Sequence, residues 1–121
     1  MYPKKVAEDT AQVLRSYLTY MAVRLIVEQL TETNPPQALW LVNYTSSHSI
    51  QDGEAYLDGL MDENKELVLR VLTVRQDLAE SVLDLMPEMV KKSIVQANID
   101  HRRRLLERLT SSTQTNDSQE Q

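Results

Sequence analysis

The chain has 121 residues, with 13 Lys and Arg against 18 Asp and Glu and a net charge of −5 at pH 7. This length allows one domain with a real core and a short tail, and the negative charge argues against general affinity for nucleic acid. Because Cys is absent, the sequence excludes disulfides, thiolate metal sites and a cysteine nucleophile. No signal-like segment and no apolar run of membrane-spanning length is present in the sequence, so we expect a soluble, untargeted chain.

The first predicted helix covers about residues 3–33, with Pro3 in its first turn. Its middle is apolar on more than one face. The residues concerned are Val13, Leu14, Tyr17, Leu18, Tyr20, Met21, Val23, Leu25, Ile26, Val27 and Leu30. We therefore expect this helix to contact two apolar surroundings, its own bundle and something else.

A second, short helix is predicted over about residues 36–46. Asn34 suits its N-cap, Pro35 its first position and Gln37 its third. The residues expected to be buried are Leu39, Trp40, Val42 or Tyr44.

A polar loop over residues 45–51 contains a single apolar residue, Ile50. Asp52 then suits the N-cap of a third helix that reaches about Asp62. Its inward residues are expected to be Tyr56, Leu57, Leu60 and Met61.

The last predicted helix runs from about residue 64 to 109. A straight helix of this span is on the order of 70 Å long, whereas a compact domain of this chain length is about 35 Å across. Pro87 lacks an N–H and predicts a bend just before it. The distal half still has apolar residues in need of partners, and we expect a second copy of the chain to supply them in a homodimer.

No pattern of period two appears, so the predicted fold class is all-α. Each subunit is expected to be a four-helix bundle with a long, Pro-bent C-terminal helix, paired in a homodimer. The helical domain is expected over residues 1–109 and a disordered polar tail over residues 110–121.

Catalysis finds no support in the sequence. His48 and His101 are the two histidines, and no metal-binding pair, phosphate loop or nucleophile motif is present. We predict no enzyme activity, no cofactor and no metal site. The acidic residues Asp62, Glu63 and Glu66 could form a cation site. A better explanation is that they lie at a helix N-terminus, where the helix dipole favours negative side chains.

Two sets of residues are candidates for protein binding. Tyr17 and Tyr20 share one face of the first helix and are either core or interface aromatics or the wall of a peptide groove, to which Ile50 and Gln51 could contribute.

The second set is polar. Its members at the end of the first helix are Gln29, Glu32, Thr33 and Asn34, for which simple capping is the alternative. The basic cluster of His101 to Arg104 is explained either by the helix dipole or, together with Arg70, by carboxylates of a partner. Binding of this cluster to nucleic acid ranks third.

Three runs carry a resemblance that covers residues 6–110: SYLTYMAVRLIVEQLTETNP, SIQDGEAYLDGLMDENKELVLRVLTVRQDLAESVLDLMPEMV and NIDHRRRLLERLT. They closely resemble the RbcX family of Rubisco assembly chaperones. The resemblance implies an arc-shaped homodimer that clamps the C-terminal peptide of the Rubisco large subunit in a central hydrophobic groove.

It further implies that the chaperone contacts an adjacent large subunit, favours assembly of the core formed by large subunits, and is then displaced by small subunits. The groove residues implied are Tyr17, Tyr20, Ile50 and Gln51. The residues implied at the peripheral contact are Gln29, Glu32, Thr33, Asn34, Arg70 and Arg102. The lack of a transit peptide predicts a bacterial cytoplasmic location, with carboxysome association left open. The net charge and the lack of a long apolar run predict neither nucleic acid nor membrane as partner. The competing hypothesis is a generic dimeric helical adaptor for another protein's amphipathic or extended peptide.

Overall fold

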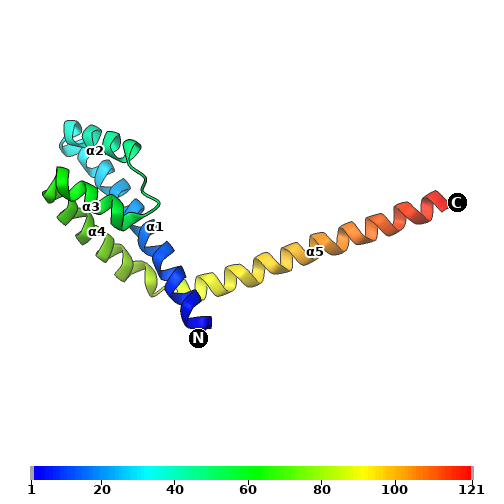
Figure 1. The fold of residues 1–121 in the computed structure, drawn as a ribbon. Helices are drawn as coiled ribbons and strands as arrows, with labels where there is room; N and C mark the ends of the chain where they lie inside the picture. The colour runs from blue at the N-terminus through cyan, green and yellow to red at the C-terminus, as the bar shows by residue number, and fades with distance from the viewer. Residues whose placement is uncertain (1, 121) are drawn as a thin grey trace. The chain divides into compact units, whose positions relative to one another are not determined.

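The structure is a computed structural model that describes the backbone of residues 2–120 and the side chains of residues 2–112. The described residues form five α-helices and no strand (Figure 1), which confirms the all-α prediction. The chain divides into two compact units, Met1–Ser81 and Val82–Gln121.

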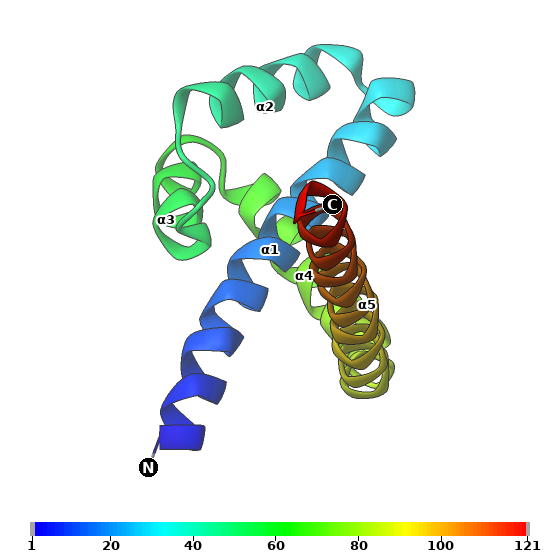
Figure 2. The same cartoon turned by 90° about the vertical axis from the view of Figure 1, so that its right-hand side faces the viewer.

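The first unit contains α1 (Tyr2–Thr33), α2 (Pro35–Ser47), α3 (Gly53–Glu63) and most of α4 (Lys65–Leu83). α1 packs against both α2 and α3. Figure 2 shows the first turns of α1 extending beyond α3, and residues 2–13 are all exposed. Only the later part of α1 therefore belongs to the core of this unit.

Side-chain caps begin three of the helices. Asn34 Oδ1 accepts the N–H of Gln37 at 3.4 Å, and Asp52 Oδ1 accepts the N–H of Ala55 at 3.2 Å, which confirms both predicted caps. Asn64 does the same at the start of α4, where its Oδ1 accepts a backbone N–H at 3.1 Å. These bonds satisfy donors that a helix start leaves open.

The core of the first unit draws apolar residues from all four helices. They are Ala22, Val23, Ile26, Leu30, Ala38, Leu41, Tyr44, Tyr56, Leu57, Leu60, Leu67, Val68 and Val71. Of the four alternatives predicted for the buried side of α2, Tyr44 is buried, while the buried Ala38 and Leu41 were not predicted. Leu39, Trp40 and Val42 are exposed, as is Met61 of α3. The buried residues of α2 instead recur at steps of three, which places one face of the helix on the core.

The predicted long last helix is interrupted. α4 ends at Leu83, and two turn residues precede α5 (Met86–Glu120). Pro87 is the second residue of α5, where a missing N–H costs no helical hydrogen bond. The turn is closed by the N–H of Leu85, which donates to the carbonyl oxygen of Val82 at 3.1 Å. The predicted bend before Pro87 is thus a break between two helices.

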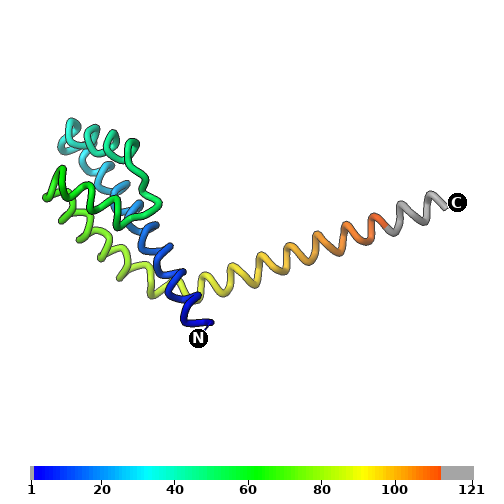
Figure 3. Tube along the Cα trace, in the orientation of Figure 1, coloured from blue at the N-terminus to red at the C-terminus, as the bar shows by residue number. Residues whose placement is uncertain are grey.

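Along α5 the larger apolar side chains are exposed in the single chain. They are Met89, Val90, Ile94, Val95, Ile99, Leu105, Leu106 and Leu109. Residues 110–112 continue the helix. The rest of the predicted disordered tail lies outside the residues whose side chains are described (grey in Figure 3), and its disorder stays a prediction. Among the described residues, no helix combines the length and apolar character needed to cross a membrane.

Candidate functional site

An exposed apolar stripe runs along α1. Val6, Val13, Tyr17 and Tyr20 follow one another at steps of seven, four and three, so they share one side of the helix. Tyr17 is 57% exposed and Tyr20 41%, and their ring centroids lie 6.4 Å apart. Contiguous exposed apolar surface on a protein typically marks an interaction site. We call these four residues the α1 stripe.

The opposite side of α1 carries the core. Leu18, Ala22 and Ile26 are buried, while the two tyrosines point away from them. This arrangement confirms that the apolar residues of α1 occupy more than its core side. It also excludes Tyr17 and Tyr20 as core aromatics of the single chain.

A hollow of about 450 Å³ lies beside Tyr20, between α1 and α2. Its lining residues are Tyr20, Val23, Arg24, Val27, Glu28, Val42, Thr45 and Ser46. The three valines make its surface apolar, and Arg24 and Glu28 form an ion pair at 3.9 Å on α1. The hollow suits an apolar side chain next to the Tyr20 ring.

The loop between α2 and α3 carries the other two predicted groove residues. Ile50 is half-buried and packs against the core cluster. Gln51 is exposed and lines a second hollow, of about 360 Å³, together with Val13 of the stripe. The structure thus brings Tyr17 next to Tyr20 and places Gln51 and Val13 on one hollow, whereas Ile50 packs on the core.

Val13 was missed as a candidate, although its place four residues before Tyr17 gave the signal. Gly53 was also missed, and it fixes the loop between α2 and α3 against α1. Its N–H donates to Ser16 Oγ at 3.1 Å, and a Cβ at this position would lie 3.0 Å from Thr19 Oγ1. Glycine suits this close approach, because a Cβ here would press on Thr19 and on the backbone of Ser16, and one of them would have to shift.

The predicted polar set is partly assembled at the end of α1. Arg70 Nη2 of α4 donates to Gln29 Oε1 at 2.6 Å, and Thr33 Oγ1 donates to the Gln29 carbonyl oxygen at 2.9 Å. Asn34 caps α2 as described above, so the capping explanation holds for it. Glu32 is exposed in the same turn of α1.

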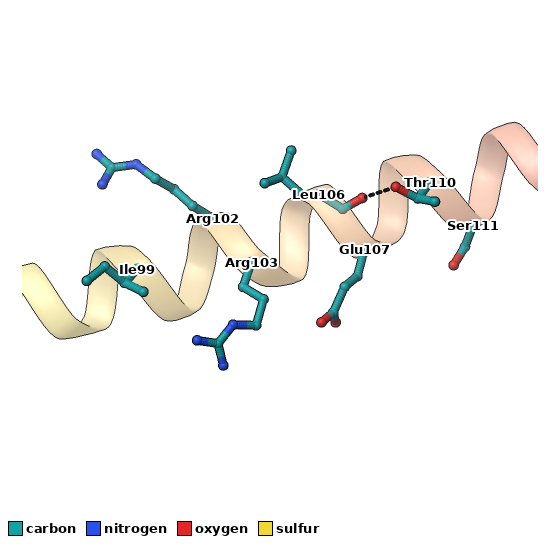
Figure 4. A pocket seen from close by; sticks show the side chains of 7 residues that line it. All are labelled: Ile99, Arg102, Arg103, Leu106, Glu107, Thr110 and Ser111. Atoms are coloured by element: carbon teal, nitrogen blue, oxygen red, sulfur yellow. Dashed lines mark hydrogen bonds between the residues drawn. The ribbon is translucent and has the colours of Figure 1, made fainter.

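Arg102 belongs to the second unit, on α5. It borders an apolar hollow of about 600 Å³ with Ile99 and Leu106, and Figure 4 shows Arg102 and Leu106 projecting on the same side of the helix. Thr110 Oγ1 donates to the Leu106 carbonyl oxygen at 2.9 Å, so the helix continues beyond the arginines. The interpretation of this basic cluster as last-turn cations is therefore wrong.

The acidic residues near residue 64 are also placed differently from the prediction. Asp62 and Glu63 end α3, and only Glu66 lies in the first turn of α4. A helix N-terminus thus explains one of the three. Within the described residues, no group of His, Cys, Asp and Glu could hold a metal ion.

Comparison with known proteins identifies the family. Residues 1–111 match the family model described as RbcX protein. The chain is 61% identical over 110 residues to the RuBisCO chaperone RbcX of Synechocystis sp., covering 91% of this chain and 80% of that protein. It is 62% identical over 107 residues to the RuBisCO chaperone RbcX of Picosynechococcus sp., covering 88% of this chain and 80% of that protein.

A solved structure agrees with these sequence matches. The crystal structure of RbcX in complex with substrate is similar with a TM-score of 0.87 and 61% identity, covering 91% of this chain and 99% of that chain. These relatives are named as chaperones and not as enzymes. The chain belongs to the RbcX family.

Proposed function

We propose that the chain is a Rubisco assembly chaperone that binds the C-terminal peptide of the Rubisco large subunit. The observation that carries the proposal is the α1 stripe, which leaves two tyrosines exposed on a helix whose other side is in the core. Two of the relatives are named RuBisCO chaperone RbcX, and a similar structure is that of RbcX in complex with substrate.

The chemistry of the stripe suits an extended peptide with alternating aromatic residues. Side chains two apart on an extended chain point to the same side, roughly 7 Å apart. Tyr17 and Tyr20 offer two rings with centroids 6.4 Å apart, a similar spacing. The exposed Gln51 amide can both donate to and accept from a peptide backbone, which would fix the register. Ile50, packed on the core, would hold Gln51 in place.

A homodimer of arc-like shape completes the proposed groove. The exposed apolar residues of α5 support it, because a helix with this much uncovered apolar surface is stable in water only when a partner covers it. Two copies of the α1 stripe would then face one peptide at the centre of the clamp.

The polar residues at the end of α1 are proposed to contact an adjacent large subunit, with Arg70 and Gln29 at the centre of this contact. Their mutual hydrogen bond presents a guanidinium beside an amide, a pair suited to carboxylates and backbone carbonyls. Glu32, Thr33, Asn34 and Arg102 belong to the same proposed peripheral contact. Such exposed contacts are individually modest in water, which favours later displacement by small subunits once the core of large subunits has formed. Action in the bacterial cytoplasm, with or without the carboxysome, fits this role.

The test is a fluorescence-anisotropy titration of the labelled C-terminal peptide of the Rubisco large subunit and its scrambled version. We expect wild type to bind only the authentic peptide, and the Tyr17→Ala/Tyr20→Ala variant to lose binding. Leu39→Ala is the matched control, since it removes an exposed apolar side chain of α2 that lines neither hollow. Equal binding to both peptides would favour the generic adaptor, and no binding would refute the proposal.

A further inference from the structure

An ionic cluster joins the first turn of α3 to α1 and α4. Glu54 Oε1 lies 2.6 Å from Arg75 Nη1 of α4 and 3.1 Å from Arg15 Nε of α1. The same Arg75 nitrogen donates to Thr19 Oγ1 of α1 at 3.1 Å. A single guanidinium nitrogen from α4 therefore binds both of the other helices.

Burial makes Arg75 the stronger member of this cluster. Its side chain is 20% exposed and Thr19 is fully buried, whereas Arg15 is 51% exposed. Charge-assisted bonds shielded from water are short and strong, while exposed ion pairs contribute little. Thr19 Oγ1 also donates to the Arg15 carbonyl oxygen at 2.8 Å, so its hydroxyl is fixed and its lone pair faces Arg75. The Arg75 bonds are thus the strongest polar link of this cluster between the first turn of α3 and its neighbours, although Glu54 itself is 42% exposed.

The cluster lies directly behind the proposed peptide site. Glu54 follows Gly53, whose N–H is bonded to Ser16, and it comes three residues after Gln51. On α1, Ser16 and Thr19 flank Tyr17 and precede Tyr20. A movement of the first turn of α3 would therefore displace the loop relative to the α1 stripe.

We propose that Arg75 is a positioning residue for the peptide site. It binds no peptide itself; it holds Glu54 and Thr19 together and so sets the place of Gln51, which lines the same hollow as Val13. This inference rests on the proposed function, since it assigns how that site is kept in shape. The partners of Arg75 lie 21 and 56 residues away in the chain, so the role depends on the fold and not on a local motif.

The first measurement is amide hydrogen exchange in full-length wild type, Arg75→Met and Gln76→Met. The reporter is the Gly53 N–H, because its acceptor belongs to α1. We expect Arg75→Met to speed its exchange about tenfold and to leave the amides of residues 22–30 unchanged. Gln76→Met is the matched control, since the Gln76 side chain bonds Glu80 at 3.2 Å within α4, and it should change neither.

The second measurement is peptide affinity by the anisotropy titration. Arg75→Met should weaken binding about fivefold, and Arg75→Lys, which keeps a charged donor, should restore most of it. In a Gln51→Ala background the Arg75→Met effect should shrink, because both changes act on the same loop. Unchanged Gly53 exchange, or a full effect in the Gln51→Ala background, would overturn the proposal.

Two further outcomes are separable. If Arg75→Met also speeds exchange across residues 22–30, Glu54→Gln replaces it as the test, because that change weakens the same link from its more exposed end. Glu54→Gln must then speed Gly53 exchange for the proposal to stand. Failure of wild type to bind the peptide would refute the proposed function, and the exchange data would then decide independently whether Arg75 holds the loop.

Discussion

Gly59 of α3 allows the Tyr44 ring to reach its place in the core. A Cβ at residue 59 would lie 2.6 Å from Tyr44 Oη. The ring has little freedom to retreat, because it stacks on His48 at 4.0 Å and on Trp40 at 5.5 Å between centroids. It also meets the Tyr56 ring edge-on at 5.4 Å. We therefore predict that Gly59→Ala destabilises the protein although it improves helix propensity.

The magnitude follows from two opposing terms. Alanine is favoured over glycine inside a helix by about 1 kcal/mol. Relieving the clash requires a shift of roughly 0.9 Å to reach an ordinary contact of about 3.5 Å. Overpacking of this kind costs about 1–3 kcal/mol, so the expected net loss of unfolding free energy is about 1 kcal/mol.

Removal of the Tyr44 hydroxyl should reverse the sign. Tyr44→Phe loses a hydrogen bond to the Tyr56 carbonyl oxygen that is 3.3 Å long, at a cost of about 0.5–1 kcal/mol. In that background the added Cβ meets only the ring carbon Cζ of residue 44 at 3.9 Å, an ordinary contact, so Gly59→Ala should stabilise by about 1 kcal/mol. The two changes are thus coupled by roughly 2 kcal/mol.

The assay is urea unfolding followed by circular dichroism, with all four proteins at one chain concentration so that association is constant. An equal effect of Gly59→Ala in both backgrounds would show that the Tyr44 hydroxyl does not occupy the space above residue 59. Stabilisation by Gly59→Ala in wild type would refute the reasoning in the same way.

Three other predictions are direct. Burial raises the pKa of Tyr44 and of Tyr56 above 10.0. The stability they contribute is therefore complete below pH 10 and is lost as pH rises through the folded pKa. Measurements of the unfolding free energy from pH 8 to 11 should show this loss, and Tyr56→Phe should reduce its slope. Asn64→Ala should lower the unfolding free energy by about 1 kcal/mol in urea unfolding through loss of the α4 cap, and no change would show that the cap is dispensable. Arg70→Ala should bind the peptide like wild type but give fewer assembled cores of large subunits on native gels, and a normal yield would remove Arg70 from the peripheral contact.

Local chemistry made several features predictable from the sequence. Asn34 and Asp52 act as caps because their side chains bond to residues only three positions away, and Pro87 marks the start of α5 because its ring excludes a continuous ladder. The two apolar sides of α1 were predictable because the helix is long. Over many turns, the helical period shows which apolar residues share each side.

Features that depend on tertiary packing were not predictable in this way. In α2 the apolar residues are nearly consecutive, so the period does not reveal that Ala38 and Leu41 face the core while Leu39 is exposed. The Arg75 cluster joins residues from three helices, and no spacing in the sequence signals it. In the candidate site, the tyrosine pair followed from helical spacing, whereas the shared hollow of Gln51 and Val13 depends on how the loop is docked.

The position of the core along the chain has a consequence for the order of events during synthesis. The buried apolar residues of the core lie between Leu18 and Val71, within the first unit, so every residue of this core is made before the second unit. At 5–20 residues per second, residues 82–121 follow about 2–8 s later. The exposed apolar side chains of α5 are therefore made after every residue of that core. In the proposed homodimer their pairing is a bimolecular step, so the delay between translation and a competent chaperone should shorten as expression of the chain rises.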